Sequence, residues 1–153
     1  MTHAFSDAEI SALAAGYLRY VVALRGDDPD AVSSPETNPD EWAYKTVETM
    51  IRKGAAAEAW PVVLELLRQT PDAELGNSAA GPLEALVLRH GEALVEAIEA
   101  EAAQDERFRW ALGCIWLFAS DLKAPIRDRI VRASGGAIKV NPSILSTSFG
   151  RAT

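Results

Sequence analysis

The stretch GPLEALVLRHGEAL, residues 81–94, shows how this chain is built. Pro82 suits the first turn of a helix, because its fixed φ is helical and the N–H it lacks is not needed there. Apolar residues at helical spacing follow, and Gly91 is typical of a helix end. The stretch therefore predicts a short helix that ends at Gly91, with another helix following almost without a linker.

The same pattern of polar cap, apolar stripe and Gly or Pro stop recurs along the chain, and no segment alternates as a strand would. We predict an all-α fold of about seven short helices, stacked as antiparallel hairpins in a HEAT-like array or a compact bundle. Pro61 is expected in the first turn of its helix. The expected helices begin near Ser6, Asn38, Ala56, Pro82, Gly91, Asp105 and Ala124. Ser6 and Glu9 are expected to form a capping box, Asp105 is expected to cap its helix, and the helix that begins near Ala56 is expected to end near Gln69.

The length of 153 residues predicts one domain, which we place at residues 1–135. Residues 26–38 are rich in Pro, Ser, Asp and Asn and form a candidate mobile loop. Residues 136–153 carry apolar side chains without a regular period. They are expected to be a C-terminal arm that is either flexible or packed in extended form on the body.

Composition favours a cytoplasmic protein. The apolar and charged fractions, 48% and 24%, are ordinary for a globular domain. No apolar run approaches the roughly 20 residues needed to span a bilayer, and the N-terminus does not resemble a signal peptide. Cys114 is the single cysteine, and its apolar surroundings predict a buried thiol.

The net charge of −7 is unevenly distributed along the sequence. Residues 1–106 hold 7 basic and 20 acidic side chains, whereas residues 107–153 hold 8 basic and 2 acidic ones. This balance disfavours binding of nucleic acid by the whole chain. The simplest expectation is that the basic end neutralises the acidic body within the fold.

No pattern of residues predicts a catalytic centre, a metal site or a cofactor. The chain has two histidines, His3 and His90, and no CxxC or HxxxH motif. Glu84 and His90 stand six residues apart near the two ends of one predicted helix, so they do not face each other. We interpret them as helix-end fasteners, with Glu84–Arg109 as a candidate ion pair. The alternative is a pocket in which Glu84, His90 and Arg109 converge.

The four tryptophans divide into two groups. Trp42, Trp60 and Trp116 fall on predicted apolar stripes, so they are expected in the core. Trp110 falls off the stripe of its helix, beside Arg107, and is a candidate interface anchor.

Between Trp60 and Trp116, about a third of the chain, stands a set of short motifs: Trp60, Gly81-Pro82-Leu83-Glu84, Leu86, His90-Gly91, Phe108-Arg109, Leu112 and Trp116. This set resembles a bacterial family known only as a domain of unknown function. The resemblance implies a small helical protein without an assigned activity, and it transfers no catalytic residue.

Three hypotheses of function follow. The first is a non-enzymatic interaction module whose acidic helix face meets a basic protein partner, as an immunity or antitoxin-like inhibitor would. The same glutamates suit a merely solvated face equally well. The second is a small ligand-binding protein or hydrolase that uses the Glu84, His90 and Arg109 pocket. The third is a homo-oligomeric scaffold joined through the C-terminal arm. The acidic face consists of Glu92, Glu96, Glu99 and Glu101.

Overall fold

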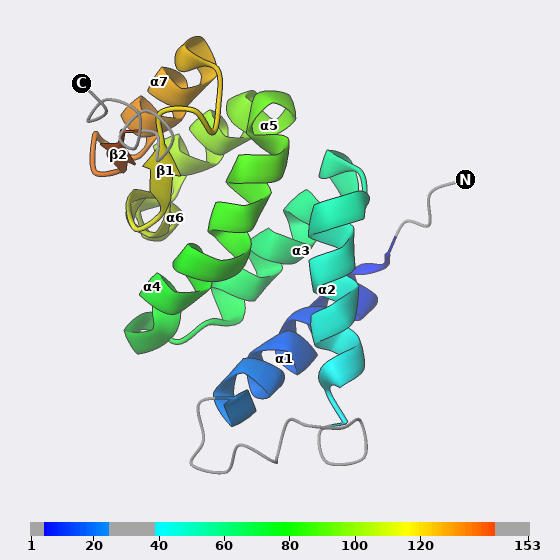
Figure 1. Ribbon diagram of the computed structural model, residues 1–153. Helices are drawn as coiled ribbons and strands as arrows, with labels where there is room; N and C mark the ends of the chain where they lie inside the picture. The colour runs from blue at the N-terminus through cyan, green and yellow to red at the C-terminus, as the bar shows by residue number, and fades with distance from the viewer. Residues whose placement is uncertain (1–4, 25–38, 143–153) are drawn as a thin grey trace, which may run out of the picture. The chain divides into compact units, whose positions relative to one another are not determined.

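A computed structural model describes residues 5–24 and 39–142 (Figure 1). Contacts divide the chain into two compact units, the first ending at Ser78 and the second beginning at Ala79. The predicted loop at 26–38 and the tail beyond residue 142 lie outside the described residues. The expectation of a single domain over 1–135 stays a prediction.

The first unit is built from helices that pack on one another. Each of α1 (Asp7–Leu24), α2 (Glu41–Lys53) and α3 (Ala56–Gln69) contacts the other two. A 3-10 turn and the short helix α4 (Leu75–Ser78) close the unit. Its core contains fully buried side chains from all three long helices, namely Ala14, Ala43, Val47, Ala59, Val62, Val63 and Leu66.

The second unit is organised around the long helix α5 (Glu84–Gln104), which contacts both α6 (Glu106–Gly113) and α7 (Ala124–Ala133). A π-helical segment, Ala79–Leu83, leads into α5. The largest buried side chains are Leu83, Leu86, Ile98, Leu112, Ile115, Leu117 and Ile130.

A two-stranded parallel sheet lies in the second unit. Strands β1 (Trp116–Phe118) and β2 (Lys139–Asn141) are joined through α7, and Leu117 stands opposite Val140. No strand was expected from the sequence, because three residues are too few to show alternation. With so small a sheet the all-α class is confirmed, and β2 gives the start of the predicted arm an extended form.

Helix α5 corrects the expected break at Gly91. It continues through Gly91 to Gln104, so the predicted fourth and fifth helices are one. A Cβ at Gly91 would lie 3.3 Å from Ile130 Cδ1 and 3.3 Å from Leu122 Cδ2. The glycine therefore allows close packing rather than ending the helix.

Of the other local predictions, two helix caps are confirmed and the expected position of Pro61 is wrong. The capping box of Ser6 and Glu9 forms both of its hydrogen bonds, at 3.0 and 3.1 Å. Asp105 caps α6 as expected, accepting from two backbone N–H groups. Pro61 lies inside α3 rather than in its first turn, since the helix begins five residues earlier. Pro82 precedes α5 within the π-helical segment.

None of the helices within residues 5–24 and 39–142 combines the length and the apolar character that crossing a membrane requires.

Candidate interaction surfaces

Glu84 fastens the start of α5 to strand β1. Its carboxylate accepts the backbone N–H of Trp116, with Oε1 2.7 Å from the nitrogen. Glu84 was expected to accept N–H groups of its own helix end. The carboxylate instead accepts from the backbone of a strand that the sequence did not reveal.

A second carboxylate holds the same strand. The N–H of Phe118 donates to Asp121 Oδ2 at 2.7 Å, whereas the N–H of Ala119 donates to the carbonyl of Asn141 at 2.8 Å. Because successive amides of a strand point to opposite sides, the N–H groups of Trp116 and Phe118 face away from β2. Carboxylates occupy both, so β1 is fixed along the edge opposite β2.

The side chain of Trp116 is 60% exposed on this fixed strand. Its expected place in the core was wrong, because α6 ends at Gly113 and the next residues follow a strand period. Ile115 and Leu117 are buried, which turns Trp116 outward. The register places Trp116 opposite Lys139, so both side chains stand on one side of the sheet.

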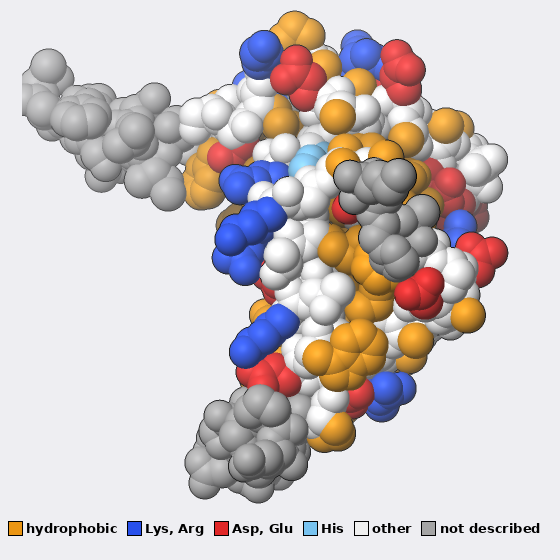
Figure 2. Space-filling model, turned by 90° about the vertical axis from the view of Figure 1, so that its right-hand side faces the viewer, with side chains coloured by type: hydrophobic (Ala, Val, Ile, Leu, Met, Phe, Trp, Pro, Cys, Tyr) orange, Lys and Arg blue, Asp and Glu red, His pale blue; other side chains and the backbone are white. Residues whose placement is uncertain are grey.

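The other tryptophans also differ in exposure. Trp110 is 57% exposed on α6, which agrees with its predicted position off the apolar stripe. Trp42 is 54% exposed on α2, so its expected burial was wrong. Trp60 is half-buried. Figure 2 shows apolar side chains reaching the surface between charged ones on the face that it draws.

The proposed Glu84, His90 and Arg109 pocket gains no support from the contacts. Arg109 donates to the carbonyl of Ala102 at 3.2 Å and pairs with Glu106 at 3.4 Å. No hydrogen bond or ion pair joins it to Glu84 in the described chain. His90 is half-buried within α5, so its expected role at a helix end was wrong, because α5 does not end there.

The predicted acidic face is partly neutralised by the basic residues that follow it in the sequence. Glu99 receives two hydrogen bonds from Arg129 of α7, one of them from Nε at 3.1 Å. These bonds lower the pKa of Glu99 and raise the pKa of Arg129. Glu92 lies 3.7 Å from Lys123, and Glu101 accepts from Gln104 at 3.1 Å. Glu96 is exposed.

Cys114 is half-buried beyond the end of α6 rather than fully enclosed. Its thiol lies 3.4 Å from the carbonyl of Trp110, and burial raises its pKa. A raised pKa disfavours the thiolate, which is the nucleophilic form. Across the part of the chain that the structure describes, no three His, Cys, Asp or Glu side chains are grouped to hold a metal ion.

Comparison with known proteins gives one family. The model of a family described as a family of unknown function, DUF6869, matches residues 30–138. No curated protein and no solved structure matches the chain.

Proposed function

Since that match covers well over half of the sequence, the chain belongs to the family of unknown function DUF6869, and we propose that it is a non-enzymatic protein-interaction module. The observation that carries the proposal is Trp116, a tryptophan 60% exposed on a strand that two carboxylates hold in place. Tryptophan is the residue type most enriched among the anchors of protein interfaces.

The fixed strand matters because binding costs the freedom of the groups that become ordered. A side chain presented on a strand already held by Glu84 and Asp121 loses less of that freedom on binding than one on a loose segment. Exposing a large aromatic ring is unfavourable for the isolated chain. A partner that covers Trp116 would recover that energy.

A more specific version of the proposal is an inhibitor that resembles immunity or antitoxin proteins and meets a basic partner. Glu96 and Glu101 support this version, since neither forms an ion pair with any described residue. Glu99 contributes less, because Arg129 already engages it. The described residues of the second unit hold 9 acidic and 8 basic side chains, so electrostatic attraction would have to be local.

Affinity capture from an extract of the source organism tests the proposal. The intact chain, Trp116→Ala and Trp42→Ala are compared at low and moderate salt. We expect the intact chain to capture a protein partner, which is either a different protein or a second copy of this chain. Recovery of that partner should fall with Trp116→Ala and persist with Trp42→Ala. Recovery of every bound protein regardless of Trp116 would contradict the proposal.

The inhibitor version, in which the partner is basic, is tested with a separate double variant. Glu96→Lys combined with Glu101→Lys reverses two charges without touching the bond between Glu84 and Trp116. If the partner is basic, the double variant should weaken capture most at low salt. Unchanged recovery of the partner would contradict the inhibitor version, but it would not contradict the proposed role of Trp116.

A further inference from the structure

One face of α2, in the first unit, carries a continuous row of exposed or half-exposed polar side chains that begins with a tryptophan. We call this row the α2 face; it consists of Trp42, Lys45, Thr46, Thr49 and Lys53. Trp42, Lys45, Thr49 and Lys53 follow one another at intervals of three or four residues, which places them on one side of a helix, and Thr46 lies four residues after Trp42 on the same side. The side of α2 that faces away from this row is buried through Ala43, Val47 and Ile51, and Met50, which is 7% exposed, lies at the boundary between the two sides.

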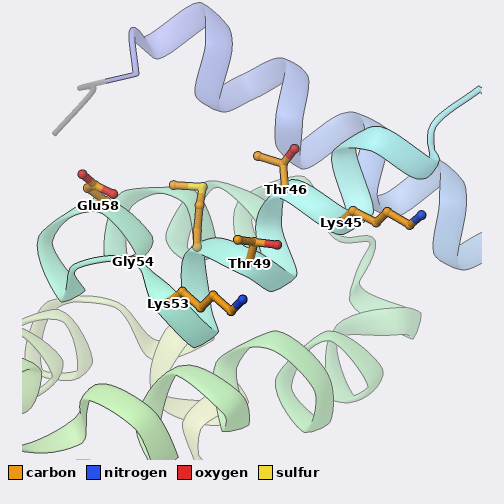
Figure 3. A pocket seen from close by; sticks show the side chains of 7 residues that line it. Lys45, Thr46, Thr49, Lys53, Gly54 and Glu58 are labelled. Atoms are coloured by element: carbon orange, nitrogen blue, oxygen red, sulfur yellow. The ribbon is translucent and has the colours of Figure 1, made fainter.

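The α2 face forms one wall of an open groove of about 440 Å³. Figure 3 shows Lys45, Thr49 and Lys53 emerging from successive turns of α2, while Glu58 comes from the beginning of α3. The remaining lining residues are Thr46, Met50 and Gly54. The groove therefore combines ammonium and hydroxyl groups with the apolar side chain of Met50.

The charges of the groove favour an acidic occupant along the α2 wall. Lys53 forms no ion pair with any described residue. Lys45 lies 3.0 Å from Glu41, but its side chain is 69% exposed and its ammonium can accommodate a second carboxylate. Glu58, at the far wall, would repel an acidic group that approached α3 instead of α2.

The distance between the two lysines favours a peptide over a small anion as the occupant of the groove. Lys45 and Lys53 are eight residues apart on α2, about 12 Å along the axis at 1.5 Å per residue. One carboxylate or phosphate could contact both ammonium groups only if both lysine side chains bent toward each other along the helix. An extended peptide that rises about 3.3 Å per residue can do so with acidic residues three or four positions apart.

We propose that the α2 face binds an acidic, partly apolar peptide segment of a partner protein. Carboxylates of the segment pair with Lys45 and Lys53, and its apolar side chains cover Trp42 and the small exposed part of Met50. Trp42 extends the surface one turn beyond the groove, and its 54% exposure leaves the indole available. This surface belongs to the first unit and Trp116 to the second, so the inference goes beyond the interaction module proposed above.

The test is a titration of the full-length ¹⁵N-labelled chain with a 12-residue synthetic peptide, followed by amide chemical shifts. The peptide carries glutamate at every third or fourth position with leucine and serine between. We expect saturable shifts in α2, from Trp42 to Gly54. Lys53→Glu should weaken binding about threefold to tenfold, and Trp42→Ala should also weaken it.

Lys123→Glu is the matched control, because it makes the same charge change at an exposed site at the start of α7. It should leave the affinity within twofold of the intact chain. Thermal unfolding of each variant confirms that it is folded, and Lys53→Gln, which removes the charge without reversing it, should give an intermediate loss.

Three results would overturn the proposal. They are the absence of saturable shifts in α2, equal affinity for the intact chain and Lys53→Glu, and saturation by free glutamate or inorganic phosphate at the peptide's concentration. The last result would identify a site for small anions rather than a peptide surface. If Trp116→Ala does not change recovery in the extract capture, the proposed function fails but the peptide titration is unaffected. The two proposals can therefore fail independently.

Discussion

Glu84 and Trp116 are 32 residues apart in the sequence, yet one hydrogen bond of 2.7 Å joins the carboxylate of the first to the backbone of the second. The bond connects the first residue of α5 to the first residue of β1. It occupies an N–H group that β2 cannot reach, and it fixes the strand on which an exposed tryptophan stands. The contact bears on the proposed function because it holds the strand that carries Trp116.

Removing the Glu84 carboxylate should loosen β1. Glu84→Ala leaves the N–H of Trp116 without its acceptor, and we expect a loss of about 1–3 kcal/mol in the free energy of unfolding. Glu84→Gln retains a carbonyl oxygen and should lose less. Urea unfolding measures the loss, and amide hydrogen exchange at Trp116 locates it. Glu96→Ala, at an exposed site on the same helix, is the control and should change stability by less than about 0.5 kcal/mol.

Gly91 should tolerate alanine but not leucine. Alanine gains about 1 kcal/mol of helix propensity, which its tight contacts with Ile130 and Leu122 offset, so Gly91→Ala should stay within about 1 kcal/mol of the intact chain. Gly91→Leu overfills the same space and should cost about 1–3 kcal/mol. Chemical denaturation compares the two. Equal stability of both variants would show that Gly91 is not packed against these side chains.

The bond between Glu99 and Arg129 should make a contribution to the free energy of unfolding that is lost at acidic pH. The folded pKa of Glu99 is lowered by the guanidinium, so its contribution is present above the unfolded pKa, about 4.3. That contribution disappears as the pH falls through the lower folded pKa. NMR titration of the Glu99 side chain should show the lowered pKa, and Arg129→Met should return it toward the ordinary value. An unchanged pKa in Arg129→Met would refute the assignment.

Cys114 should react slowly with thiol reagents. Burial raises the pKa of its thiol, so less thiolate is present at neutral pH than in the unfolded chain. Reaction with a disulfide reagent at pH 7.5 should be several times slower for the folded chain than in denaturant. A reaction rate that is the same in both states would contradict the burial of this group.

Features that depend on neighbouring residues were predictable from the sequence. The capping box of Ser6 and Glu9, the cap at Asp105 and the bounds of α3 all depend on side chains within a few positions of one another. Such local interactions carry the same meaning in many folds. For the same reason, the exposure of Trp110 followed from the apolar period of its own helix.

Features that depend on distant residues were not predictable. Gly91 can end a helix or admit a close neighbour, and the choice depends on Leu122 and Ile130, about 30 to 40 positions further along. Trp116 continued the apolar period of α6, but pairing with Lys139 places it in a strand. The exposure of Trp116 and the role of Glu84 follow from that pairing, which no local pattern contains.

The most direct test of the account is quantitative extract capture with Glu84→Ala beside Trp116→Ala. Glu84→Ala keeps the tryptophan but removes the bond that holds its strand. We predict that recovery of the Trp116-dependent partner falls in both variants, and falls less with Glu84→Gln. Full recovery with Glu84→Ala, in a variant that remains folded and has lost protection at the Trp116 amide, would show that a fixed Trp116 is not what the partner recognises.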